Sequence, residues 1–140
     1  MNWFRKNNAP IIVIGMHRSG TTMFTVILKR CGVFMGADLS SNQESYTFTH
    51  FNEMLLNKAG GCWNDPKAID PDTNMEFDQR TFGMQFLHIK REPLNALRFI
   101  MGRSWGWKDP RNTFTLPYWI NRYFPNARVV HIYRNGLDDA

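Results

Sequence analysis

An apolar run that leads into a glycine-bounded loop constrains the fold of this chain more than any other feature. Residues 10–14 read Pro-Ile-Ile-Val-Ile, which is typical of a buried strand in a parallel sheet. Gly15 and Gly20 bound the loop that follows, and residues 21–30 have the pattern of a helix. In this order, the N–H groups of the loop and of the first helical turn converge on one point and bind an anion. The segment therefore predicts a phosphate-binding loop.

The residues inside the loop distinguish it from the loop of a nucleotide triphosphatase. A Walker A loop reads G-x-x-x-x-G-K-[ST], and its lysine reaches the β- and γ-phosphates of the nucleotide. Here Thr21 and Thr22 follow Gly20, and the cation is Arg18, which comes earlier in the loop. A guanidinium and hydroxyl groups suit a phosphate ester. A P-loop nucleotide kinase or NTPase that needs Mg²⁺ remains an alternative.

Length and composition indicate a single domain over residues 1–140. A chain of 140 residues, 43% of them hydrophobic, can bury one core. The net charge of +5 is equally consistent with a small anionic ligand and with ordinary surface charge. The basic residues are scattered and form no nucleic-acid-binding arm. Cys31 and Cys62 lack metal-ligand spacing and are expected to be reduced thiols. No stretch resembles a signal peptide or a membrane span, so we expect a cytoplasmic protein that binds neither nucleic acid nor membrane.

The remaining pattern alternates between helices and strands. We expect a helix that starts at residue 46 and ends at the glycine pair 60–61, and further helices over residues 77–90, 93–101 and 116–124. Strands are expected within 105–110 and over 128–133. Pro117 is tolerable if it lies in the first turn of its helix. The order of these elements predicts an α/β domain that has a parallel sheet and right-handed crossovers.

Three segments taken together resemble one family. They are residues 15–22 (GMHRSGTT), 107–111 (WKDPR) and 124–135 (FPNARVVHIYRN). In this order they resemble sulfotransferases that use 3′-phosphoadenosine 5′-phosphosulfate (PAPS), and the resemblance runs from about residue 10 to residue 140. It implies a P-loop NTPase-like, three-layer α/β domain with a parallel sheet. It also implies transfer of a sulfuryl group from PAPS, with no metal, to a hydroxyl or amine of a small-molecule, carbohydrate or peptide acceptor.

The resemblance also implies roles for individual residues. The 5′-phosphosulfate of PAPS would be held by Arg18, Ser19, Gly20, Thr21 and Thr22, and the 3′-phosphate by Arg134. Lys108 would approach the sulfuryl group or the bridging oxygen and help the leaving phosphate depart. The acceptor must lose a proton as it attacks, which requires a base. Glu44 is the first candidate, because tyrosine-sulfating relatives place a base at about this spacing, and His50 is the second, because cytosolic members use a histidine.

Several residues near these motifs have a second interpretation. Glu44 could equally be an exposed loop acid, and Asp109 could be the Mg²⁺-binding acid of an NTPase. Trp63, Trp105 and Trp107 could stack on adenine or form the wall of a pocket, although core or structural packing is the expected role for each.

The end of the sequence leads to a further expectation. Relatives carry a second 3′-phosphate ligand, a serine, about eight residues after the arginine that corresponds to Arg134, and that position falls just past Ala140. We therefore expect the domain to be incomplete at its C-terminus and to show turnover near background. A binding-only module is accordingly a second alternative to the enzyme.

Overall fold

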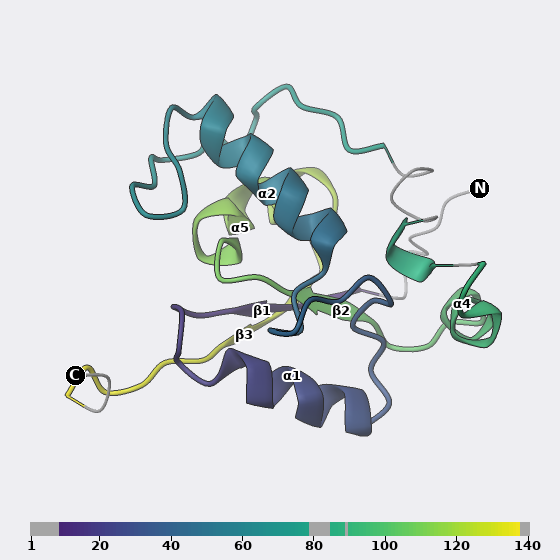
Figure 1. The fold of residues 1–140 in the computed structure, drawn as a ribbon. Coiled ribbons are helices and arrows are strands. Elements are labelled where there is room, and N and C mark those ends of the chain that lie inside the picture. Colours follow the sequence, from purple (N-terminus) through teal and green to yellow (C-terminus); the bar gives the residue numbers. More distant parts are fainter. Residues whose placement is uncertain (1–8, 79–84, 89, 138–140) are drawn as a thin grey trace.

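The computed structural model describes residues 9–78, 85–88 and 90–137 of the chain (Figure 1). Its strands are β1 (Ile11–Ile14), β2 (Gly106–Lys108) and β3 (Arg128–His131). They form a parallel sheet in the order β2-β1-β3, so that the first strand of the sequence is the central one. Ile12 and Val13 are fully buried in this central strand, as the apolar run predicts.

The helices cover both faces of this sheet. They are α1 (Thr21–Arg30), α2 (Tyr46–Lys58), α4 (Pro93–Ile100) and α5 (Asn112–Arg122). Figure 1 shows α2 and α5 on one face, α1 on the opposite face, and α4 beyond one end of the sheet. The predicted three-layer α/β architecture with a parallel sheet is therefore confirmed. None of the described helices is both long and apolar enough to cross a lipid bilayer.

Aromatic side chains fill the layer between the sheet and the α2–α5 pair. The rings of Phe48 and Trp107 stack with centroids 3.8 Å apart, and Trp119 meets both rings at steep angles. Trp105 and Trp107 are 1% and 0% exposed, which confirms their predicted packing role. Trp63, in contrast, is 54% exposed and therefore does not pack in the core.

Gly106 allows β1 and β2 to approach each other. A Cβ atom at this position would lie 2.0 Å from the carbonyl oxygen of Ile11, a distance that no side chain tolerates. The glycine therefore brings β2, and with it Lys108 at its end, into register beside β1.

Three predicted elements differ from the structure. Helix α5 begins at Asn112 rather than at 116, so Pro117 lies inside it. Its first turn is anchored to the sheet because buried Asn112 donates to the carbonyl of Val13 and accepts from the indole of Trp107. This tertiary contact offsets the backbone hydrogen bond that a proline cannot donate. The apolar residues within 128–133 predict a buried strand, but β3 is largely exposed, because it packs mainly against β1. The other outer strand, β2, is fully buried.

The predicted helix over residues 77–90 is not seen as one element. Residues 71–78 are irregular, and residues 85–87 form a single helical turn. The remaining part of this prediction, at residues 79–84 and 89, lies outside the described residues.

Candidate active site

A cavity of about 550 Å³ lies where the three strands end. Five of the predicted donor-binding residues line it: Arg18, Gly20, Thr21, Thr22 and Arg134. The predicted catalytic residues Glu44 and Lys108 line it as well. Lys108 is the last residue of β2, the phosphate loop follows β1, and Arg134 follows β3. The cavity therefore occupies the carboxyl edge of the sheet, where α/β folds bind ligands.

The phosphate loop has a backbone that depends on its glycines. A Cβ atom at Gly15 would lie 2.5 Å from the carbonyl oxygen of Ile132 and 2.9 Å from a methyl group of Thr21. Gly20 and Arg18 both have a left-handed backbone, with φ of 99° and 65°. The loop then leads directly into α1, whose first N–H groups have no acceptor within the helix and favour an anion.

Ser19 shapes the loop and does not line the cavity. Its hydroxyl and its backbone N–H both donate to the carbonyl of Met16, at 2.7 and 3.3 Å. Ser19 is 5% exposed, and these two hydrogen bonds close the turn on its buried side. Its predicted contact with the donor remains a prediction.

Lys108 and Glu44 form an ion pair inside the cavity. The Lys108 ammonium lies 3.0 Å from Glu44 Oε1, and the two side chains are 3% and 14% exposed. The same ammonium donates to the carbonyl of Asn42 at 3.0 Å and to the hydroxyl of Thr22 at 3.4 Å. The structure therefore brings a carboxylate, an ammonium and the phosphate loop together, although Glu44 and Lys108 are 64 residues apart in sequence.

Asp38 holds the loop that carries Glu44. Its buried carboxylate accepts from the hydroxyl of Ser45 at 3.0 Å, and from the N–H and hydroxyl of Thr47 at 2.9 and 2.6 Å. Ser40 closes the loop, since its N–H donates to the carbonyl of Glu44 at 2.9 Å. These hydrogen bonds fix the segment on both sides of Glu44, although it lies on a connection between helices.

Sequence reasoning missed both Asp38 and Asn42. Asn42 contributes a backbone carbonyl, which has no signature in the sequence. Asp38 precedes the start of α2 by eight residues, which is too far for a recognisable capping motif. The signal that could have found Asp38 is the pair of hydroxyl residues, Ser45 and Thr47, at the entrance to α2.

The interactions of Asp109 are those of a structural residue. It is fully buried, and it accepts from the amide of Asn52 at 2.9 Å and from the N–H and guanidinium of Arg111 at 3.0 Å each. Protein donors thus occupy both carboxylate oxygens, and Asp109 fixes the turn after Lys108. This arrangement disfavours the magnesium-binding interpretation. Among the described residues, no group of three or more His, Cys, Asp or Glu side chains could hold a metal ion.

His50 and Trp63 lie outside the lining of the cavity. His50 is exposed on α2 and does not line the cavity. Trp63 packs edge-on against the ring of His17, with centroids 5.5 Å apart, and His17 does line the cavity. An exposed tryptophan therefore borders the rim of the candidate site.

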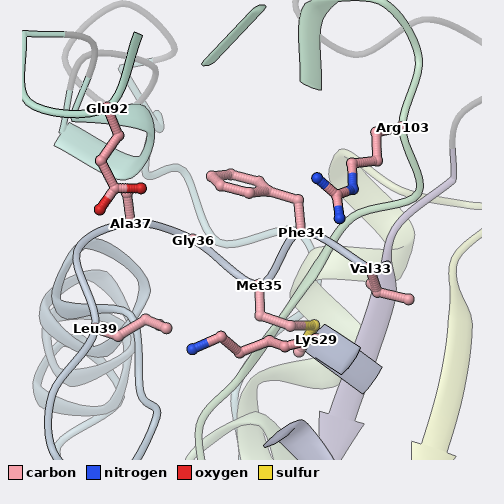
Figure 2. A pocket seen from close by; sticks show the side chains of 9 residues that line it. All are labelled: Lys29, Val33, Phe34, Met35, Gly36, Ala37, Leu39, Glu92 and Arg103. Atoms are coloured by element: carbon pink, nitrogen blue, oxygen red, sulfur yellow. The ribbon is translucent and has the colours of Figure 1, made fainter. Parts of the chain in front are cut away.

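A second cavity, of about 350 Å³, lies at the other end of α1 (Figure 2). Figure 2 shows Lys29, Glu92 and Arg103 around the apolar side chains of Phe34 and Met35. None of the nine residues predicted to bind the donor or to catalyse lines it. The cavity at the strand ends is therefore the better candidate.

Comparison with known proteins agrees with this geometry. A family model described as "Sulfotransferase family" matches residues 10–140. No curated protein and no solved structure matches the chain at a significant level. The matched range includes the phosphate loop, the Lys108–Glu44 pair and Arg134, all of which the fold gathers at one cavity. The chain belongs to the sulfotransferase family.

Proposed function

We propose that this chain binds PAPS in the cavity at the strand ends and transfers its sulfuryl group to a hydroxyl or amine acceptor. The observation that carries the proposal is the distribution of charged groups over three adjacent strand ends. The phosphate loop follows the central strand, Arg134 follows β3, and the Lys108–Glu44 pair lies at the end of β2. This arrangement suits a nucleotide that carries two separate anionic groups and reacts at one of them.

The 5′-phosphosulfate fits the loop and the first turn of α1. The helix N-terminus carries a partial positive charge, and the Arg18 guanidinium adds a full one. Arg134 lines the same cavity from the β3 side and is the proposed partner of the 3′-phosphate. An NTPase would need a lysine where Thr21 stands, and its second acid would have to be Asp109, whose carboxylate is buried.

The proposed chemistry uses the two paired side chains in different roles. Glu44 accepts the proton of the acceptor hydroxyl while the acceptor oxygen forms a new bond to sulfur. The bond between sulfur and the bridging oxygen breaks, and its electron pair remains on the 5′-phosphate of the nucleotide. Lys108 donates a hydrogen bond to that oxygen. The protein contributes mainly position and charge stabilisation, as in phosphoryl transfer.

The contact of Arg18 with the sulfuryl group can be tested by calorimetry. The Arg18→Ala variant is expected to lose about tenfold or more in affinity for PAPS, which is the value of one hydrogen bond to a charged group. Its affinity for 3′-phosphoadenosine 5′-phosphate (PAP), which lacks the sulfuryl group, is expected to fall less. Arg18→Lys should recover only part of the loss, because an ammonium lacks the planar fork of a guanidinium.

Arg30→Ala serves as the matched control. Arg30 lies in the last turn of α1, is exposed and does not line the cavity. This variant should bind both nucleotides as the unmodified chain does. If Arg18→Ala bound PAPS as tightly as the unmodified chain, the assignment of Arg18 to the sulfuryl group would be wrong.

A further inference from the structure

The ammonium of Lys108 is fully committed to contacts within the protein. A lysine ammonium has three N–H donors and no acceptor. Three protein oxygens lie within reach of Lys108, namely Glu44 Oε1 at 3.0 Å, the Asn42 carbonyl at 3.0 Å and the Thr22 hydroxyl at 3.4 Å. The side chain is 3% exposed. A hydrogen bond from Lys108 to a bound anion therefore has to replace one of these three.

The loop that carries Glu44 also engages the phosphate loop. The Thr22 hydroxyl donates to the carbonyl of Asn42 at 3.2 Å. Gln43, whose φ of 63° is left-handed, accepts from the ammonium of Lys29 at 2.8 Å and so fastens the loop to α1. Two side chains of the proposed donor site, Lys108 and Thr22, are thus tied to the loop that holds the proposed base.

Of the three acceptors of Lys108, Glu44 is the one that an anion replaces most directly. Asn42 contributes a backbone carbonyl within a hydrogen-bonded loop, and Thr22 contributes a hydroxyl on α1. Glu44 contributes a charged carboxylate on a side chain, and a second anion close to it is repelled. A buried lysine also requires an opposite charge, so it leaves one anion only when another replaces it.

We propose that the donor and Glu44 compete for Lys108, so that binding of the donor releases Glu44 to act as the base. This inference rests on the proposed function. The bound 5′-anion takes the N–H bond that Lys108 gives to Glu44, and the freed carboxylate then accepts the proton of the acceptor. The base is therefore available only after the donor has bound, which makes donor binding the first step. The competition also lowers the apparent affinity for the donor, because part of the binding energy is spent in breaking the pair.

Binding of PAP to a Glu44→Gln variant tests the competition without any turnover. Glutamine keeps the size of the side chain and removes its charge, so Lys108 is held less firmly. We expect calorimetry to show that this variant binds PAP about three- to tenfold more tightly than the unmodified chain, because the energy that held Lys108 to Glu44 no longer opposes binding. Removal of the proposed catalytic base thus improves ligand binding.

A second background separates this competition from a simple charge effect. In a Lys108→Met chain the competition no longer exists, so adding Glu44→Gln should raise the PAP affinity by less than about twofold, which is the part due to repulsion between the carboxylate and the anion. Removal of a nearby negative charge, by itself, would raise the affinity equally in both backgrounds. Glu53→Gln is the matched control, because Glu53 pairs with Arg111 and does not line the cavity. Thermal melting of each variant confirms that it is folded.

The outcomes distinguish the competition from the function on which it rests. A gain with Glu44→Gln that falls below about twofold in the Lys108→Met background supports the competition. An equal gain in both backgrounds, or no gain in either, overturns the competition and leaves the donor site intact. If the unmodified chain does not bind PAP, the proposed function fails and the competition fails with it.

Discussion

Replacement of Asn52 by alanine is expected to destabilise the fold more than most single substitutions in this chain. Asn52 lies on α2, is fully buried and connects this helix to α5 and to the turn after β2. Its amide donates to Asp109 and to Asn112 at 2.9 Å each, and its oxygen accepts from the indole of Trp119 at 2.8 Å. The substitution removes three hydrogen bonds at once and leaves their partners buried.

The magnitude follows from these partners. Each buried neutral hydrogen bond contributes about 1 kcal/mol, and a buried donor or charged acceptor left unpaired costs about 1–3 kcal/mol. The indole of Trp119 would lose the acceptor that Asn52 provides, and the buried carboxylate of Asp109 would lose one of its donors. We therefore expect a loss of about 3–5 kcal/mol in the free energy of unfolding. That loss is a large fraction of the roughly 5–15 kcal/mol that stabilises a typical domain.

Urea denaturation followed by tryptophan fluorescence measures this loss. The midpoint is expected to fall by about 2 M, with little change in the slope of the transition. Asn57→Ala is the control, because Asn57 lies on the same helix and is exposed, and its effect should stay within about 0.5 kcal/mol. A loss below about 1 kcal/mol for Asn52→Ala would contradict this expectation and show that the buried hydrogen bonds contribute little to stability.

Two further predictions concern the sheet and a buried tyrosine. Gly106→Ala should prevent pairing of β1 with β2, because its Cβ atom would lie 2.0 Å from the Ile11 carbonyl oxygen. Gly136→Ala is the control and should be neutral, because a Cβ atom there has no neighbour within 4 Å. Circular dichroism and solubility compare the two variants, and a folded Gly106→Ala chain would contradict the expectation. Burial, together with Tyr123, raises the pKa of Tyr118 above its usual value of 10.0, so the folded state favours the neutral phenol. The contribution of Tyr118 to stability is therefore complete below pH 10 and declines as the pH rises beyond it. Urea denaturation between about pH 9 and 11 should show that the free energy of unfolding falls less with pH in Tyr118→Phe than in the unmodified chain.

The part of the fold closest to the site could be predicted from local sequence. The apolar β-branched run, the two glycines and the helical pattern after them specify β1, the phosphate loop and α1, and the observed bounds of α1 agree with the predicted range. Because parallel strands end at one edge of the sheet, Lys108 and Arg134 could also be expected near this loop. Local patterns succeed here because each residue acts through its own backbone or its immediate neighbours.

The remaining features depend on contacts between distant segments. The start of α5 is set by Asn112, which bonds to β1 and to Trp107, and no local pattern encodes those partners. The position of Glu44 depends on buried Asp38 and on the carbonyl of Asn42. Trp63 follows α2 on a loop, and its ring contacts His17 instead of the core.

Comparison of PAP with ADP tests whether the cavity at the strand ends binds PAPS. The two nucleotides differ in the 3′-phosphate and in the number of 5′-phosphates, and Arg134 is the proposed partner of the 3′-phosphate alone. One hydrogen bond to a charged group contributes about 1.5–3 kcal/mol, so calorimetry should show PAP binding about tenfold or more tightly than ADP, with or without Mg²⁺. Arg134→Ala should remove most of that preference. Equal affinities for PAP and ADP, or a preference for ADP that requires Mg²⁺, would contradict the PAPS assignment and favour a nucleotide kinase or NTPase.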